Sequence, residues 1–215
     1  MQIISVINQK GGVGKTTTVI NLAAGLSQHN KKILVIDLDP QGNATTGLGL
    51  SNMENSSDTI YDVLNGTKEI YQVIKKTQFE NLDLVTSNVD LSGLEVETAD
   101  DTNRAFVLKR KLAAYLNDSR GSYDYILIDC PPSLSLLTIM ALVSSDALVV
   151  PLQTEFFALE GLTQLMKTIE RIKNNLNPSL EIRGILLTMY DKRNKLSSQV
   201  ESEARNYFKE KVYNT

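Results

Sequence analysis

Short runs of β-branched and aliphatic residues alternate along the chain with longer segments of helical spacing, and this alternation strongly constrains the fold. Strands arranged in this way need crossover connections, which produce an α/β fold with a mostly parallel sheet and helices on both of its faces. Ligands of such folds bind at the carboxyl ends of the strands. The runs expected to form strands are Ile3–Ile7, Ile33–Ile36, Leu82–Val85, Ile126–Ile128, Ala147–Val150 and Ile185–Leu187.

Two of the intervening segments carry apolar residues at helical spacing and are expected to pack against the sheet. Between the strands, the stretch 42–58 is rich in Gly, Asn, Ser and Thr, which predicts a loop. The stretch 88–103 has weak periodicity, and we expect a mobile connection there. The residues that mark the two helix faces are Leu108, Leu112 and Leu116 in the first, and Leu159, Leu162, Leu165, Met166, Ile169 and Ile172 in the second.

Length and composition are those of an ordinary globular chain. The 215 residues fit one domain, and no apolar run approaches the roughly 20 residues that cross a bilayer. The chain has one cysteine, Cys130, and begins without a secretory signal, so we expect a cytoplasmic protein that does not act at a membrane. A net charge of −3 excludes a strongly basic nucleic-acid footprint over the whole chain, so any such contact needs a local patch.

The sharpest motif lies directly after the first predicted strand and directly before a helical stretch at Thr17–Gln28. Glycines there let successive backbone N–H groups converge on phosphate oxygens, and the positive end of the following helix points at the same anion. In such a loop Lys15 would bridge the β- and γ-phosphates, and Thr16 would ligate Mg²⁺. The residues of this predicted nucleotide-binding loop are Lys10, Gly11, Gly12, Val13, Gly14, Lys15, Thr16 and Thr17.

Acidic residues follow two of the predicted strands at the edge where this loop lies. Asp37 and Asp39 end the second strand, and Asp129 ends the strand Ile126–Ile128. An ionised carboxylate at this edge would hold Mg²⁺ through a coordinated water, because Mg²⁺ keeps several of its waters. The single histidine, His29, lies near the end of the first helix, where we expect it to stabilise the helix C-terminus rather than act as a base.

The loop departs from the usual phosphate-loop pattern, because Gln9 stands at the first glycine position and Lys10 follows it. This arrangement resembles the deviant Walker A motif of the ParA/MinD family of P-loop NTPases. The resemblance implies that Lys10 reaches across a dimer interface to the partner's nucleotide, as an arginine finger does. It also implies that Asp39 orients the attacking water, Asp37 contributes to the metal environment and Asp129 is the Walker B carboxylate.

Further stretches, at Asp39–Thr45, Asp129–Ser133 and Ala158–Leu162, are similar to the chromosomal ParA (Soj) proteins of that family. What this resemblance implies is an ATPase that uses ATP and Mg²⁺, forms an ATP-dependent homodimer and binds DNA without sequence preference at the nucleoid. A ParB-like partner would stimulate hydrolysis. Within Leu187–Arg193, the matching family stretch implies a DNA-binding role for Arg193.

One departure concerns the C-terminus, because family members usually continue for about 40 residues beyond the end of this chain. The missing part would contribute to the nucleotide pocket and the DNA surface, so we expect weaker DNA binding than in a longer protein. Three alternatives stay open: a MinD-like ATPase that cycles on a membrane, a metabolic enzyme such as an ATP-dependent ligase or reductase subunit, and a scaffold that binds nucleotide without turnover. Cys130 is expected to pack as a small apolar residue, which disfavours a cluster-bearing reductase.

Overall fold

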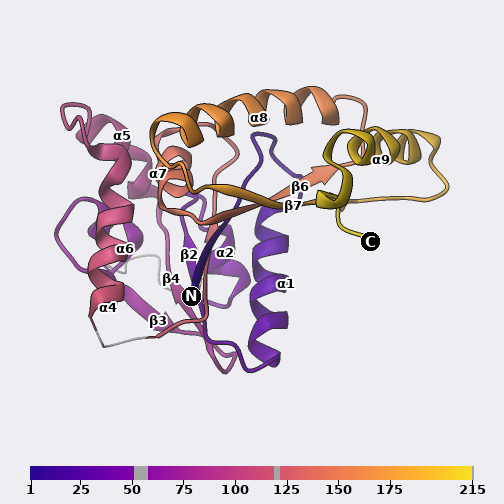
Figure 1. Ribbon diagram of the computed structural model, residues 1–215. Helices are drawn as coiled ribbons and strands as arrows, with labels where there is room; N and C mark the ends of the chain where they lie inside the picture. Colours follow the sequence, from indigo (N-terminus) through magenta and orange to yellow (C-terminus); the bar gives the residue numbers. More distant parts are fainter. Residues whose placement is uncertain (51–57, 119–121, 215) are drawn as a thin grey trace.

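The computed structural model describes residues 1–50, 58–118 and 122–214. Within them lies a seven-stranded sheet of order β3-β4-β2-β5-β1-β6-β7, in which every pairing except β3 with β4 is parallel (Figure 1). The predicted parallel sheet is therefore confirmed. The strands are β1 (Gln2–Val6), β2 (Ile33–Asp37), β3 (Ile74–Lys76), β4 (Leu82–Val85), β5 (Tyr125–Asp129), β6 (Ala147–Gln153) and β7 (Glu181–Thr188).

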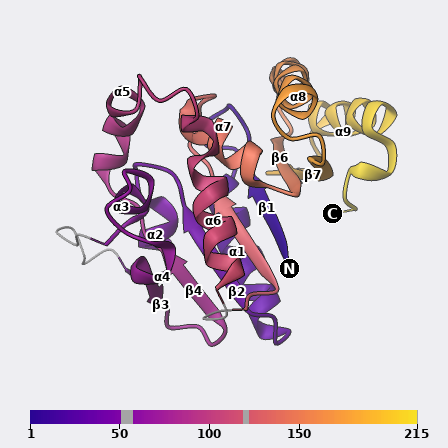
Figure 2. The same cartoon turned by 60° about the vertical axis from the view of Figure 1, so that its left-hand side comes forward.

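Helices cover both faces of the sheet, as Figures 1 and 2 show from two directions. The longer helices at the predicted positions are confirmed, although the first begins two residues earlier than expected, at Lys15. The helices are α1 (Lys15–Gln28), α2 (Asn43–Gly47), α3 (Ile60–Leu64), α4 (Ile70–Val73), α5 (Leu94–Glu97), α6 (Val107–Asn117), α7 (Leu136–Ser144), α8 (Ala158–Asn175) and α9 (Lys195–Phe208), with 3-10 turns at Val89–Gly93, Arg104–Phe106 and Lys209–Lys211.

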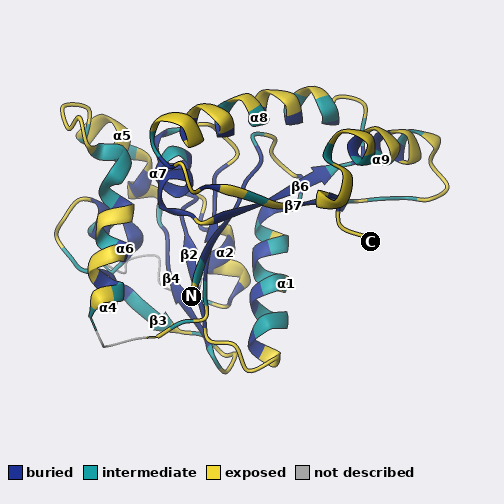
Figure 3. Cartoon of the chain, in the orientation of Figure 1, coloured by how far each residue is buried: buried dark blue, intermediate teal, exposed yellow. Residues whose placement is uncertain are grey.

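The strands β1, β2, β4, β5 and β6 are buried on both faces, which is why they read as continuous apolar runs rather than alternating ones (Figure 3). On one face, Leu34 and Ile126 pack in a cluster that includes residues of α3 and α6. On the other face, Val35 and Leu127 pack with Val19 of α1. A further cluster joins β6 and β7 to α8 and α9. The helix faces predicted from Leu108 and Leu162 spacing are core, as expected.

Two predicted loops contain regular structure, which corrects the expectation for them. The stretch 42–58 holds α2, and the stretch 88–103 holds the turn Val89–Gly93 and α5. Residues 51–57 of the first stretch lie outside the described residues. These helices are too short to give a periodic signal, so tertiary contacts decide them.

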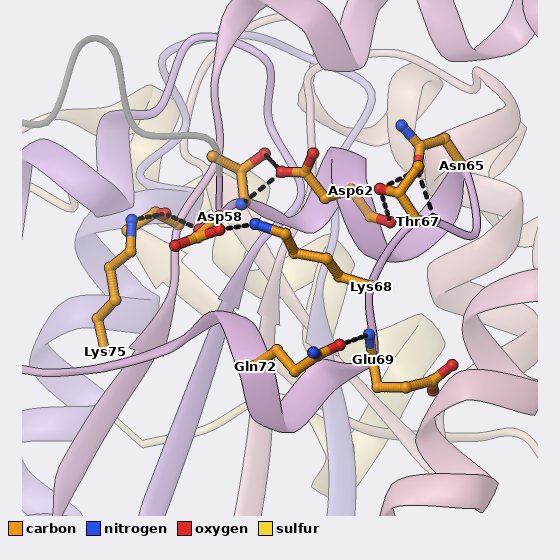
Figure 4. Close-up of polar contacts among 10 residues, drawn as sticks. Asp58, Asp62, Asn65, Thr67, Lys68, Glu69, Gln72 and Lys75 are labelled. Atoms are coloured by element: carbon orange, nitrogen blue, oxygen red, sulfur yellow. Dashed lines mark hydrogen bonds and ion pairs between the residues drawn. The ribbon is translucent and has the colours of Figure 1, made fainter.

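A group of polar contacts fixes the region of α3 and α4 against the sheet (Figure 4). The ammonium of Lys75 donates to the Thr86 hydroxyl at 3.0 Å, and Lys68 forms an ion pair with Asp58. The backbone N–H of Ile60, at the start of α3, donates to the Thr86 carbonyl at 2.9 Å. This side of the molecule is therefore fastened at the carboxyl end of β4.

Candidate phosphate and magnesium site

The glycine-rich loop connects β1 to α1 in a conformation that only glycine adopts easily. Gly12 and Gly14 have φ angles of 74° and 90°, in the left-handed region. Gly14 is the N-cap of α1 and has no side chain that could accept from the first turn. The first N–H groups of α1 are thus left for an anion, which is the arrangement expected at a phosphate site.

The two lysines of the loop lie in different environments. Lys15 is 7% exposed, and its ammonium donates to the Lys10 carbonyl at 3.0 Å. Burial lowers the pKa of Lys15, although the charge of Asp129 opposes this. The Lys10 side chain is 51% exposed and forms an ion pair with Glu155, in the turn between β6 and α8. Lys15 therefore points into the site, whereas Lys10 lies at its rim.

The structure brings the predicted carboxylates together at the carboxyl edge of the sheet. Asp37 and Asp129 are register neighbours on β2 and β5, and both are fully buried. Asp39 follows two residues after Asp37 and is 5% exposed. Asp39 accepts from the backbone N–H of Gln41 at 3.0 Å, which closes the turn before α2.

Asp37 is held by hydrogen bonds from its own neighbourhood. Its Oδ2 atom accepts from the backbone N–H and the hydroxyl of Thr45, both at 2.7 Å, and its Oδ1 atom accepts from the Asp39 N–H at 3.2 Å. Burial raises the pKa of Asp37 to about 6 in spite of these bonds. Since both oxygens are engaged, Asp37 orients the Asp39 turn and α2.

Asp129 has the opposite surroundings. Both of its oxygens are buried, and neither makes a hydrogen bond of normal geometry within the described residues. Burial raises the pKa of Asp129 to about 7, with the Asp37 charge adding to the effect, while Thr16 and Lys15 act against it. A buried carboxylate without partners costs free energy that a cation or its bound water would relieve.

These residues fit a magnesium ion carried by a nucleotide better than a preformed metal cage. No group of three or more His, Cys, Asp or Glu side chains is arranged to hold a metal among the residues that the structure describes. Mg²⁺ commonly binds one or two protein oxygens and completes its shell with waters and phosphates. Thr16 and Asp129 carry such oxygens, and Asp37 lies beside Asp129 on the neighbouring strand.

Other buried side-chain atoms without a hydrogen bond belong to residues beyond the carboxyl ends of the strands, and the sequence reasoning missed most of these residues. Asn88 and Ser87 follow β4, and Ser135 precedes α7. Their position two or three residues beyond an apolar strand, or ahead of an apolar helix, is the signal that could have found them. Gln9, noted above for its place in the loop, has a buried amide nitrogen without a hydrogen bond. Within the described residues, the buried side-chain atoms without a hydrogen bond therefore belong to residues at or beyond the carboxyl ends of strands, where the phosphate loop also begins.

The remaining predicted residues have clear positions. Arg193 lies beyond β7 with its side chain 90% exposed, and it forms a two-pronged pair with Asp191 at 2.9 and 3.0 Å. His29 is the C-cap residue of α1, and Cys130 is buried in the core, as expected. In the described part of the chain, no helix is long and apolar enough to cross a membrane.

Comparison with known proteins places this site in a family. Residues 1–182 match the family described as an AAA domain. The chain is 50% identical to the chromosome partitioning protein ParA of Caulobacter vibrioides over 213 residues, covering 99% of this chain and 79% of that protein. It is 48% identical to the sporulation initiation inhibitor protein Soj of Bacillus subtilis, covering 100% of this chain and 83% of that protein. The chain belongs to the ParA/Soj family of partitioning proteins.

Solved structures give the same fold. A plasmid partition protein from Borrelia burgdorferi matches with a TM-score of 0.83 and 28% identity, covering 98% of this chain and 87% of that one. Cobyrinic acid a,c-diamide synthase from Mycobacterium smegmatis, solved with an ATP analog and magnesium, matches with a TM-score of 0.88 and 36% identity, covering 97% and 83%. The predicted P-loop NTPase fold of the ParA/Soj type is thus confirmed, and a nucleotide with Mg²⁺ agrees with the site of this member.

Proposed function

We propose that this ParA/Soj family member is a Mg-ATP-dependent partitioning switch. In this proposal ATP drives formation of a homodimer that binds DNA non-specifically at the nucleoid, and hydrolysis stimulated by a ParB-like partner releases it. The observation that carries the proposal is the unequal placement of the two loop lysines. Lys15 is buried beside Asp129, whereas the Lys10 side chain is half-exposed at the rim. In the proposal Lys15 serves the chain's own nucleotide, and Lys10 serves the nucleotide of a second copy.

Each residue of the site has a role in this proposal. The N–H groups of the loop Lys10–Thr17 and the Lys15 ammonium bind the phosphates. Thr16 and Asp129 hold the magnesium ion, which neutralises phosphate charge when bound, and Asp37 contributes to its surroundings. Asp39, in the turn that Asp37 fastens, orients the attacking water.

The Lys10–Glu155 ion pair describes the state of Lys10 before the proposed dimer forms. In the single chain the Lys10 ammonium is neutralised by Glu155. Donation to a second copy's phosphates therefore exchanges one anionic partner for another, and the stronger phosphate charge favours the exchange. Dimerisation then follows from nucleotide binding and is lost when the γ-phosphate leaves.

The proposal is tested by comparing Asp39→Ala with Lys10→Ala. Asp39→Ala keeps every phosphate contact, so with Mg-ATP it should form a long-lived dimer that does not hydrolyse ATP. Lys10→Ala should bind ATP through Lys15 and Thr16, yet stay monomeric and hydrolyse poorly. Light scattering and phosphate release report both properties. A monomeric Asp39→Ala protein, or normal dimerisation and turnover by Lys10→Ala, contradicts the role of Lys10 in trans.

A second candidate function is a metabolic ATP-dependent ligase, favoured by the 36% identity to the synthase structure. The chromosome partitioning proteins ParA of Caulobacter vibrioides and Myxococcus xanthus are more similar, at 50% and 48% identity, so the ligase is the second candidate. A sedimentation assay with Mg-ATP separates the readings: a partitioning switch pellets with DNA, a MinD-like protein pellets with liposomes, and a ligase pellets with neither.

A further inference from the structure

The C-terminal end of strand β7 makes a direct hydrogen bond to the phosphate loop. The hydroxyl of Thr188, the last residue of β7, donates to the Val13 carbonyl at 2.8 Å, although the two residues are 175 positions apart in the sequence. Val13 is 2% exposed, so water does not reach its side chain freely. This contact crosses over the edge of β6, which lies between β1 and β7 in the sheet.

The contact fixes the orientation of one peptide group of the loop. Because a peptide is planar and trans, its C=O and N–H point in opposite directions. Holding the Val13 carbonyl toward Thr188 therefore directs the Gly14 N–H to the other side. Gly14 has a φ angle of 90°, and glycine allows many backbone conformations, so this peptide needs an external anchor to keep one direction.

Thr188 is itself held in place from several sides. It is the register partner of Gln153 at the end of β6, and its carbonyl accepts from the Thr154 N–H at 3.4 Å. The Thr154 hydroxyl in turn lies 3.0 Å from the Ser197 hydroxyl on α9. Thr154 and Ser197 are both buried, so the anchor belongs to the core of this side of the molecule and not to a loose surface.

We infer that Thr188 is a positioning residue for nucleotide binding, which sets the Val13–Gly14 peptide so that the loop is ready for phosphate. The inference rests on the proposed binding of Mg-nucleotide at this loop. It adds a residue that touches neither phosphate nor metal and lies outside the loop motif. It also gives a fixed link between the nucleotide site and the segment after β7 that holds Arg193.

A matched pair of variants tests the hydroxyl alone. Thr188→Val keeps the side-chain volume and removes the donor, whereas Thr188→Ser keeps the donor and removes the methyl group. The first measurement is calorimetric titration of the chain with Mg-ADP. Thr188→Val should bind about tenfold more weakly, the size expected for the loss of one hydrogen bond, and Thr188→Ser should stay within about twofold of the original chain.

The second measurement needs no nucleotide. Hydrogen exchange of the peptide covering residues 9–18 should be faster in the nucleotide-free Thr188→Val protein and unchanged in Thr188→Ser. Equal exchange and equal affinity in both variants overturn the inference, as does an equal loss in both, which would mean that Thr188 only packs. If Thr188→Val does not fold by circular dichroism, Thr188→Ala against Thr188→Ser repeats the comparison, and failure of Thr188→Ala to fold also overturns it.

The results that would contradict the proposed function differ from those that would contradict the role of Thr188. If the unmodified chain does not bind Mg-ADP, nucleotide binding itself is wrong, whatever Thr188 does. If the unmodified chain binds, Lys15→Ala does not bind, and Thr188→Val matches the unmodified chain in both measurements, only the role of Thr188 is wrong.

Discussion

At the scale of single residues, Asp37 and Asp129 occupy equivalent places on neighbouring strands but differ in their partners. Asp37 accepts three hydrogen bonds, and Asp129 accepts none of normal geometry among the described residues. The three hydrogen bonds therefore offset part of the free-energy cost of burying the ionised Asp37, whereas Asp129 lacks such bonds and costs more to bury. Buried charged groups that carry such a free-energy cost are concentrated at functional sites, where a ligand supplies the missing interaction.

We predict opposite stability changes for the two amides at pH 8. Asp37→Asn places an NH₂ group against donors of Thr45 or Asp39 and should lower the free energy of unfolding by roughly 2 kcal/mol. Asp129→Asn removes a buried charge and should raise it by about 1–2 kcal/mol, while weakening Mg²⁺-dependent nucleotide binding. Urea unfolding of the nucleotide-free proteins measures both changes. Equal destabilisation by the two variants would contradict the contrast between these sites.

Glu155 offers a second prediction at this scale, which rests on the proposed function. Glu155→Gln removes the anion that holds Lys10 in the single chain. The pair is partly exposed and worth about 0.2–1 kcal/mol, and each copy in the homodimer releases one, so ATP-dependent dimerisation should occur at up to about thirtyfold lower protein concentration. Light scattering over a concentration series gives the midpoint, with Lys10→Ala as the control that shifts it the other way. An unchanged midpoint would mean that the ion pair does not restrain Lys10.

Single residues also show where the sequence is informative. The positions of Lys15, Thr16 and Asp129 at this edge of the sheet could be predicted, because each residue type stands at a fixed spacing from the end of a strand or the start of a helix. Glu155 and Thr188 could not, because their contacts with the loop join segments far apart in the chain. Only the register of the sheet brings those segments together.

At the scale of elements, α1 depends on a glycine at its first boundary. Gly14→Ala forces a left-handed conformation on alanine and should destabilise the chain by roughly 1–2 kcal/mol. Gly25 lies in the interior of the same helix, with open space where a Cβ would lie. Gly25→Ala should therefore stabilise the chain by about 0.5–1 kcal/mol. Chemical denaturation followed by circular dichroism compares them, and a shift in the same direction for both would refute this account of the boundary.

Helices and strands also differ in how well they can be predicted from their sequences. The six predicted strands are present because each is a buried apolar run. β3 escaped prediction because it has three residues, two of them lysines, and pairs antiparallel at the sheet edge. α2 was not predicted because its sequence, Asn-Ala-Thr-Thr-Gly, has no apolar periodicity. The hydrogen bonds that Thr45 donates to Asp37 hold this helix in place.

At the scale of the whole molecule, a net charge of −3 makes any DNA contact depend on a few exposed cations. Arg193 is one, and Asp191 neutralises it in the free chain. On the proposed function, Arg193→Ala should weaken DNA binding and lower the salt slope by about one for each lost phosphate contact. Asp191→Asn should strengthen binding by about two- to fivefold, since the arginine no longer exchanges one anion for another.

Fluorescence anisotropy with labelled DNA over a salt series measures both variants in the presence of Mg-ATP. Gln199→Ala, on the exposed side of α9, is the control expected to leave the affinity unchanged. Identical curves for the unmodified chain, Arg193→Ala and Asp191→Asn would mean that the DNA surface lies elsewhere or that DNA is not the ligand.

The position of β1 in the sheet has a consequence for how the chain is made. Of the seven described strands, β1 is the first to leave the ribosome, yet its neighbours are β5 and β6, and Gln2 pairs with Tyr125. Until the ribosome has translated that later part, the N-terminal strand has no edge to join, and the glycine loop after it has no support. The glycine loop is thus made before the strands that support it, so on the proposed function the nucleotide site forms only after β5 and β6 have been translated.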